Sequence, residues 1–434
     1  MHLVILGGGV AGLSAWRRAR EANVPVTLVE RCPRPGGLTR SIHVGGYTFD
    51  YTGHFLHLAK TAHPGLLGTA RGAWRRVTRR AGCLVDGQVI PAPFQYHLGA
   101  LPEPARAACL AGVRPLLDGA APARPASGEH LLDYFDRAFG PGVTAHFLKP
   151  YNEKLLACDL TELSAARLNR FFPAPDPAAV RAGLEGAADG GGTYNATFWY
   201  PEGDGIGRLV EQLTPDEAHE HATVTAIDPA RRVVIADGRE LPYTHLISTI
   251  PLPDLLAVCA QPGACGGAWA ARADGLCASG VAAFQLGVGG PPAAPLRDRH
   301  WLYVADPALS FFRVGCYSNV SAAMAPAGCH SLYVEVGLPS GEAVDWAALT
   351  DRVLADLARA GLLDPARVEV LLRHAIFPAY VHFDFAWETI VPAALTDLAA
   401  CGIHCAGRWG RWDYLGMEDV ILDAAAQVDR LLAD

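Results

Sequence analysis

Residues 3–12 read Leu-Val-Ile-Leu-Gly-Gly-Gly-Val-Ala-Gly, and this stretch decides the fold. The four leading apolar residues predict a strand that is buried on both faces. The next six positions fit the pattern G-x-G-x-x-G, in which Gly7 permits a tight turn, Gly9 admits a pyrophosphate and Gly12 lets a helix pack on the strand. The helix would then direct its unpaired N–H groups and partial positive charge at the phosphates.

A second strand and an acidic residue complete this pattern. A helical periodicity covers residues 11–22, and a buried strand at residues 26–29 ends in Glu30. The carboxylate of Glu30 can accept hydrogen bonds from ribose hydroxyls. A glutamate here, rather than an arginine cluster, disfavours a 2′-phosphate, so NAD or FAD is favoured over NADP. The glycine pattern alone does not choose between these two.

Residues 31–41 help to distinguish FAD from NAD. Residues 31–41 read Arg-Cys-Pro-Arg-Pro-Gly-Gly-Leu-Thr-Arg-Ser. They resemble the E-x3-R-x-G-G-x-x-x-[ST] extension of the flavin-containing amine oxidase superfamily, which includes protoporphyrinogen oxidase and, more distantly, UDP-galactopyranose mutase. The resemblance implies FAD, because the paired glycines let a second loop approach the pyrophosphate while Arg34 adds positive charge. Most amine oxidases have an arginine after the paired glycines, where this chain has Leu38.

Further segments extend the resemblance along most of the chain, chiefly to the mutase-like and protoporphyrinogen-oxidase-like members. Residues 49–57, Phe-Asp-Tyr-Thr-Gly-His-Phe-Leu-His, resemble the segment that runs under the flavin ring. This resemblance implies that Gly53 and His54 lie near that ring. Val224 falls where the family contacts adenine through backbone groups.

Residues 405–419 are similar to the terminal flavin motif of the family, particularly the mutase-like form G-R-x-G-x-x-x-Y-L-x-M. Gly407 would let the backbone approach the ligand. A helix from about Met417 to Leu432 would point its N-terminus at the flavin's pyrimidine edge, where negative charge gathers on reduction. The predicted cofactor-binding residues are Gly7, Gly9, Val10, Ala11, Gly12, Glu30, Arg31, Arg34, Gly37, Leu38, Thr39, Gly53, Val224, Gly407, Arg408, Leu415, Gly416 and Met417.

The predicted fold class is α/β, or α+β overall. A Rossmann-like FAD-binding domain would be assembled from the discontinuous segments 1–65, 200–255 and 395–434. Two insertions, 85–195 and 256–394, would form a substrate domain of mixed sheet and helices. Since ligand sites favour domain interfaces, the substrate site is expected where the second domain covers the flavin.

Three residues are the catalytic candidates. His54 would hydrogen-bond the flavin or carry a proton near neutral pH; the alternative is a structural histidine that bonds a backbone carbonyl. Arg313 lies in an apolar run, where a charge needs an anionic ligand, such as the diphosphate that mutase-like relatives bind at a comparable place, or an internal salt bridge. Tyr414 lies within the terminal flavin motif. Further candidates to line the pocket are Tyr151, Asn152, Trp199, Tyr317, Tyr380 and Trp412.

The composition bears on other classes of function. A formal net charge of −8 over 434 residues disfavours nucleic-acid binding, which needs clustered positive charge. The 11 cysteines form no C-x-x-C pair and no cluster with zinc spacing, so we expect no metal site and free thiols in a reducing cytoplasm. Cys405 does not match the linking cysteine of covalent family members, so noncovalent FAD is expected. No apolar run reaches the roughly 18 residues of a membrane span, and no signal peptide is visible, so we expect a cytoplasmic protein.

The leading functional hypothesis is an FAD-dependent oxidoreductase that transfers a hydride from a small-molecule substrate to flavin N5. The alternative is a non-redox, flavin-dependent sugar-nucleotide mutase, in which substrate and product are isomers. The terminal motif, the Gly53-His54 segment and Arg313 favour this alternative. A binding protein stabilised by FAD is a third hypothesis. An NAD-only dehydrogenase is disfavoured because the terminal motif would then have no purpose.

Overall fold

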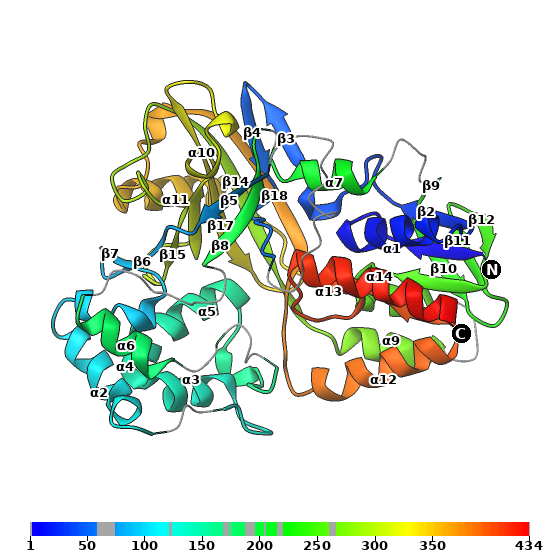
Figure 1. Cartoon of the computed structure of the whole chain (residues 1–434), viewed down its shortest axis with the longest axis horizontal. Helices are drawn as coiled ribbons and strands as arrows, with labels where there is room; N and C mark the ends of the chain where they lie inside the picture. Colours follow the sequence, from blue (N-terminus) through cyan, green and yellow to red (C-terminus); the bar gives the residue numbers. More distant parts are fainter. Residues whose placement is uncertain are drawn as a thin grey trace.

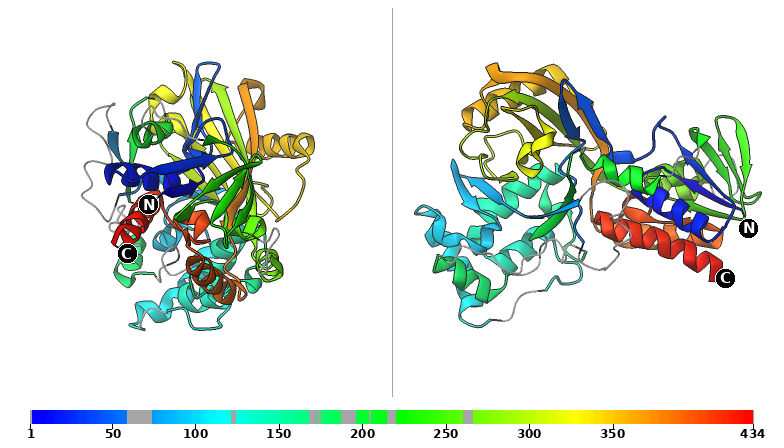
Figure 2. Two further views of the ribbon diagram at one scale, coloured as in Figure 1. Left: turned by 90° about the vertical axis from the view of Figure 1, so that its right-hand side faces the viewer. Right: turned by 45° about the horizontal axis from the view of Figure 1, so that its top comes forward.

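The computed structural model describes residues 2–58, 74–120, 124–167, 172, 175–186, 196–203, 205–214, 220–259 and 266–433. Residues 59–65, the end of the first predicted cofactor segment, lie outside the described residues. Figures 1 and 2 show two lobes, one built on a parallel sheet and the other on a larger mixed sheet with helices beside it. The predicted α/β architecture, with a Rossmann-like part and a mixed part, is confirmed.

The parallel sheet has five strands in the order β19-β13-β1-β2-β9. Side chains alternate between the faces of a strand, and a parallel sheet needs cover on both faces. Leu3 and Ile5 of β1 share a buried cluster with residues of α1, α7 and α14, whereas Val4 and Leu6 share another with residues of α8 and α12. The strands are β1 (Leu3–Leu6), β2 (Val26–Glu30), β9 (Glu220–His221), β13 (His245–Ser248) and β19 (Ile403–Cys405).

The helices of this lobe come from distant parts of the chain. They are α1 (Val10–Glu21), α7 (Gly207–Leu213), α8 (Leu252–Cys259), α9 (Gly266–Asp274), α12 (Trp387–Ala400), α13 (Gly407–Gly410) and α14 (Met417–Ala433). A small antiparallel sheet of β10 (Val224–Asp228), β11 (Val233–Ala236) and β12 (Arg239–Pro242) lies between β9 and β13 in the chain. The lobe therefore combines three separate stretches of sequence, while the predicted domain limits stay predictions.

The second lobe contains a seven-stranded mixed sheet in the order β18-β14-β17-β16-β15-β6-β7. One face of this sheet packs on α11 (Trp346–Arg359), because Val314, Leu332 and Val334 share a buried cluster with residues of that helix. Alternation then turns Arg313, Tyr333 and Glu335 to the opposite face. The strands are β6 (Ala81–Val85), β7 (Gln88–Pro91), β14 (Ala278–Gly289), β15 (Trp301–Val304), β16 (Arg313–Cys316), β17 (Cys329–Leu338) and β18 (Val368–Val381).

The remaining elements surround this sheet. The helical layer beside it is labelled in Figure 1 and contains α2 (Ala105–Leu117), α3 (Leu131–Phe139), α4 (Pro141–Val143), α5 (Lys149–Leu156) and α6 (Pro177–Leu184). Two antiparallel strand pairs and the short α10 (Tyr317–Val320) complete the lobe. The pairs are β3 (Ser41–Val44) with β4 (Tyr47–Asp50), and β5 (Trp74–Thr78) with β8 (Thr197–Pro201). Within the described part of the chain, no helix has both the length and the apolar character to cross a membrane.

Asp50, at the end of β4, is a fully buried carboxylate that ties several elements together. One carboxylate oxygen accepts hydrogen bonds from the Ser41 hydroxyl at 2.6 Å and the backbone N–H of Ile206 at 3.0 Å. The other accepts a hydrogen bond from the Tyr200 hydroxyl at 2.5 Å. Burial raises the pKa of Asp50 from 3.8 to about 6, although the three hydrogen bonds act to lower it.

We expect the free energy of unfolding of the Asp50→Asn variant to lack the pH dependence that this carboxyl gives to the wild type. The folded protein binds the proton more tightly than the unfolded chain, so the contribution of Asp50 is full below pH 3.8 and is lost as the pH rises through about 6. Urea unfolding over this range should show the wild type losing about 3 kcal/mol of stability relative to D50N. The same substitution at the exposed Asp298 serves as the control. Parallel curves for wild type and D50N would contradict the expectation.

Candidate nucleotide and substrate site

The glycine loop between β1 and α1 has the geometry of a nucleotide-binding turn. Gly7 has a φ of 94°, in the left-handed region that side chains rarely adopt. A Cβ atom on Gly12 would lie 1.7 Å from the carbonyl oxygen of Gly7, so the helix packs directly on the turn. A Cβ on Gly9 would meet nothing within 4 Å, which leaves open space above the N-terminus of α1. A pyrophosphate fits this arrangement.

Two further loops meet the first one. The backbone N–H of Gly36 donates to the carbonyl of Gly8 at 2.6 Å, and a Cβ on Gly37 would lie 3.3 Å from the Cα of Gly9. The Thr39 hydroxyl donates to the carbonyl of Gly36 at 2.6 Å and so holds this second loop. The third loop begins at Gly407, where a Cβ would lie 2.5 Å from the Cβ of Ala11. The three predicted glycine segments therefore converge on the first turn of α1.

Glu30 is fixed beside the glycine loop by backbone donors. Its two carboxylate oxygens accept hydrogen bonds from the N–H of Gly8 at 2.6 Å and of Cys32 at 2.7 Å. Arg31 and Arg34 are exposed, while Leu38, Val10 and Val224 are buried or partly buried. The predicted contacts of these residues with a nucleotide stay predictions.

The terminal motif lies where α13 leads to α14. The N–H of Gly407 donates to Asp423 at 2.8 Å, and the N–H of Gly416 donates to Asp419 at 3.1 Å. Leu415 and Met417 pack against the buried cluster that contains residues of α1. The predicted helix at residues 417–432 is confirmed as α14, and its first residue follows directly on this motif.

Arg313 forms a buried ion pair. The register of β16 and β17 places it opposite Glu335. Its guanidinium donates to both carboxylate oxygens, from Nε to Oε2 and from Nη2 to Oε1, the latter at 2.8 Å. The Arg313 side chain is 19% exposed and that of Glu335 only 2%. The internal salt bridge that the sequence left as one alternative for Arg313 is therefore present.

Arg408 has a different environment. Its guanidinium carbon lies 5.8 Å from the ring centre of Tyr380, 5.0 Å from that of Trp409 and 4.7 Å from that of Tyr414. Its Nη2 donates to the carbonyl of Ala379 at 3.2 Å. Within the described residues it has no carboxylate in ion-pair distance. Burial lowers the pKa of Arg408, and neighbouring Tyr414, Tyr380 and Asp413 partly offset this.

His54 lies close enough to Arg313 and Arg408 for their positive charges to affect its pKa. Burial, together with the charges of Arg313 and Arg408, lowers its pKa to about 4. Its Nδ1 shares a hydrogen bond of 2.9 Å with the hydroxyl of Thr52, and a backbone hydrogen bond to Thr52 partly offsets the fall in its pKa. The imidazole is therefore neutral at physiological pH. The charges of two predicted site residues, Arg313 and Arg408, therefore act on a third, His54.

Several tyrosines surround the ion pair. Arg313 and Glu335 both influence the pKa values of Tyr151, Tyr333 and Tyr380, which burial raises. The Tyr333 hydroxyl is buried without a hydrogen-bond partner in the described part of the chain. A Cβ on Gly53 would lie 2.6 Å from this oxygen, so the hydroxyl faces the predicted flavin segment. The Tyr414 hydroxyl donates to the carbonyl of Val381 at 2.7 Å, and its catalytic role stays a prediction.

Sequence reasoning missed Glu335 and Tyr333. The sequence contained an indication of Glu335, because it is the single acidic residue in the apolar run 331–336. In the same way, Arg313 is the single basic residue in the run 309–314. Four of the other pocket candidates have internal contacts, and their place in a pocket stays a prediction. The Tyr317 hydroxyl donates to the carbonyl of Asp50, the Asn152 amide donates to the carbonyl of Leu148, Trp412 is buried and Trp199 pairs with β5.

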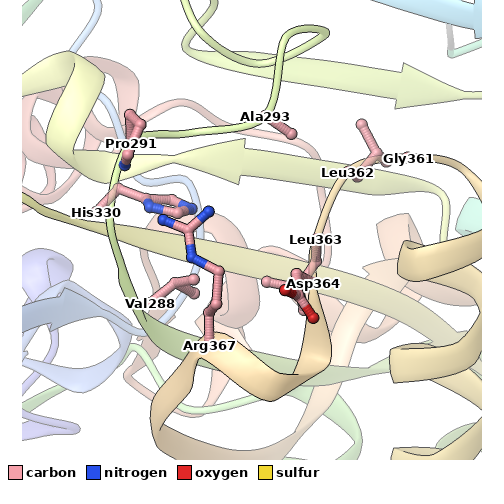
Figure 3. A pocket seen from close by; sticks show the side chains of 9 residues that line it. All are labelled: Val288, Pro291, Ala293, His330, Gly361, Leu362, Leu363, Asp364 and Arg367. Atoms are coloured by element: carbon pink, nitrogen blue, oxygen red, sulfur yellow. The ribbon is translucent and has the colours of Figure 1, made fainter.

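A separate cavity of about 250 Å³ lies near the end of β14. Figure 3 shows the guanidinium of Arg367 close to the imidazole of His330 at one side of it. His330 Nδ1 donates to the carbonyl of Gly290 at 2.7 Å. None of the predicted site residues lines this cavity, so it is distinct from the site formed by the glycine loops and the two arginines.

Comparison with known proteins accords with this geometry. Residues 5–67 match the family model of an NAD(P)-binding Rossmann-like domain. A crystal structure of reduced UDP-galactopyranose mutase superposes with a TM-score of 0.91 at 26% identity, over 100% of this chain and 95% of the other. The resemblance to the flavin amine oxidase superfamily that the sequence motifs predicted is confirmed. The matches support an enzyme of this kind.

Two other superfamily matches are less close. A protein from Exiguobacterium sp. 255-15 that is assigned as a protoporphyrinogen oxidase superposes with a TM-score of 0.74 at 19% identity, over 100% of this chain and 99% of the other. The coproporphyrinogen III oxidase of Bacillus subtilis (strain 168) is 29% identical over 181 residues, which are 38% of each chain. The match thus spans well under half the length of this curated relative. These matches include oxidases as well as a mutase, so the resemblance to the superfamily leaves the reaction open.

Proposed function

We propose that this protein is an FAD-dependent mutase that interconverts isomers of a sugar nucleotide. The observation that carries the proposal is the superposition on reduced UDP-galactopyranose mutase over the whole chain. The site geometry supports it, because Arg408 and Arg313 lie near one neutral histidine in a region rich in tyrosine hydroxyls. Such a region suits an anionic, hydroxylated substrate.

The glycine loops fit noncovalent FAD. Gly9 leaves open space at the N-terminus of α1, and the loops at Gly37 and Gly407 close on the same turn. These loops would hold the pyrophosphate, with Glu30 beside the ribose and the 415–417 segment at the ring. When bound, FAD supplies a ring that is nucleophilic in its reduced form and accepts a hydride in its oxidised form. Acid precipitation should release the flavin into the supernatant if it is noncovalent.

The residues around the ring position would orient the substrate. Arg408 would donate hydrogen bonds to an anionic oxygen and balance its charge. His54 is neutral, so it offers a hydrogen bond without adding a further positive charge. The buried rings of Tyr151 and Tyr333 would exclude water.

The test of the proposal compares oxidised and reduced protein. The purified flavoprotein is incubated with UDP-galactose and related nucleoside-diphosphate hexoses, with and without dithionite, and the nucleotides are separated by chromatography. We expect an isomeric product of unchanged mass that forms only with reductant. If no hexose in this panel is isomerised by the reduced protein, or if turnover needs oxidised flavin, the mutase proposal is wrong.

An oxidoreductase is the second candidate, and the sequence match to a coproporphyrinogen III oxidase favours it. In that case an anionic substrate would lose a hydride to the flavin. Mixing substrate and protein without oxygen should then bleach the flavin absorbance near 450 nm, roughly the position of the oxidised-flavin band. A mutase substrate would leave that absorbance in place.

A further inference from the structure

The separate cavity of about 250 Å³ lies between two connections that are distant in the sequence. One connection follows β14, and the other leads from α11 to β18. His330, near the beginning of β17, forms one side of the cavity, as Figure 3 shows. Since the volume is below that of typical sites for drug-sized molecules, a small molecule would fill it.

His330 presents one ring nitrogen to this cavity. The residue is 3% exposed, and its Nδ1–H donates to the carbonyl of Gly290 at 2.7 Å, because a carbonyl oxygen can only accept. Burial, together with the charge of Arg367, lowers the pKa of His330, although the hydrogen bond to Gly290 acts to raise it. The imidazole is therefore neutral, with a lone pair on Nε2. Within the described residues Nε2 has no hydrogen-bond partner, yet it is not a buried orphan atom, so it is open to the cavity.

Arg367 is held against the same glycine. A Cβ atom on Gly290 would lie 1.4 Å from Nη2 of Arg367, so the guanidinium occupies the space that the missing side chain leaves. The side chain of Arg367 makes no hydrogen bond or ion pair in the described part of the chain. Gly290 therefore sets a positively charged group of donors beside a neutral acceptor, and both line the cavity.

Asp364 brings a negative charge to the lining. Its Oδ1 accepts a hydrogen bond from the N–H of Ala366 at 3.1 Å. In Figure 3 the carboxylate lies apart from the guanidinium of Arg367, so the two opposite charges stay separate. A molecule that carries both charges complements this arrangement better than a simple anion or cation does.

The remaining side chains of the lining are apolar and suit an aliphatic group. They are Val288, Pro291, Ala293, Leu362 and Leu363.

We propose that this cavity binds a small zwitterionic amino acid with an aliphatic side chain. Its carboxylate would accept hydrogen bonds from the guanidinium of Arg367, and its ammonium group would donate to Nε2 of His330. Asp364 would balance the ammonium charge, and the side chain would lie on the apolar wall. The proposed site is separate from the glycine loops, and it does not rest on the proposed function.

Titration calorimetry with L-leucine on the flavin-loaded protein near neutral pH tests the proposal. Isocaproate lacks the ammonium group of leucine and isoamylamine lacks its carboxylate, so the three compounds separate the two charges. The variants R367Q, D364N and A293L change the guanidinium, the negative charge and the free space. R352Q is the matched control, because Arg352 is an exposed arginine of α11 that does not line the cavity. Thermal unfolding confirms that each variant is folded.

We expect L-leucine to bind the wild type and R352Q equally. R367Q should weaken this binding about 10- to 100-fold, as is usual when a hydrogen bond to a charged group is lost. D364N should weaken it about 2- to 5-fold, because water screens an exposed carboxylate. A293L should abolish it, since the larger side chain would fill the cavity. Isocaproate and isoamylamine should each bind at least about 10-fold more weakly than leucine.

Three results would overturn the proposal. The first is no binding of L-leucine by the wild type. The second is leucine binding that R367Q and A293L leave unchanged, since leucine would then bind elsewhere. The third is isocaproate that binds as tightly as leucine, which would exclude a role for the ammonium group. If A293L does not fold, R367Q decides, because Arg367 is exposed and its replacement leaves the core intact.

Discussion

Replacing Gly12 by alanine should abolish retention of the flavin nucleotide and destabilise the lobe that contains the parallel sheet. The added Cβ would lie 1.7 Å from the carbonyl oxygen of Gly7, so α1 must move away from β1. Overpacking of this kind costs about 1–3 kcal/mol or more, and the shift also spoils the turn that faces the pyrophosphate. Flavin absorbance of the purified protein and urea unfolding measure the two effects.

Gly9→Ala is the matched control for this prediction. Gly9 has a φ of −73°, which alanine adopts without strain, and its Cβ would meet nothing within 4 Å. G9A should therefore fold with nearly wild-type stability but bind FAD more weakly, because the methyl group occupies the space proposed for the phosphates. Equal loss of stability in G9A and G12A would contradict the packing argument. Full flavin content in both would contradict the proposed phosphate site.

Arg313→Gln should destabilise the protein by about 3–5 kcal/mol, the usual effect of removing one partner of a buried ion pair. The loss is large because the Glu335 side chain is only 2% exposed and would lose both guanidinium donors. Urea unfolding near neutral pH measures it. Adding Glu335→Gln in the same chain should restore most of the stability, since the two amides can bond each other.

An exposed ion pair provides the comparison. Arg231 and Glu240 lie 2.9 Å apart, with side chains 58% and 52% exposed. Arg231→Gln should change the stability by less than about 1 kcal/mol, because water already solvates both partners. A similar loss in R231Q and R313Q would show that burial of Glu335 is not the cause, and the argument for its role would fail.

Local pattern was enough to predict much of the fold. The apolar period of residues 346–360 predicts a helix, which is α11 (Trp346–Arg359). The apolar runs at 281–288 and 331–336 predict strands, and they lie within β14 and β17. These elements follow from hydrophobic periods that a short window contains. The convergence of three glycine segments was also predictable, because each matched a motif with a known relation to one cofactor.

The partner of Arg313 was not predictable in the same way. Arg313 and Glu335 are 22 positions apart, and only the register of two neighbouring strands brings them together. A shift of one residue would turn every side chain of β17 to the other face. Periodicity shows that each run is a strand but does not fix which strands pair.

By itself, the sequence determined the Rossmann-like beginning, from the strand through the glycine turn to Glu30, because each of those steps is a local requirement of backbone and phosphate. It also determined which residues carry charge near the site. Only the tertiary structure decided that Arg313 is neutralised, that Arg408 stands among aromatic rings, and that His54 lies near both. The physical reason is that net charge at a site depends on which buried groups are neighbours, and strand pairing sets that across long sequence separations.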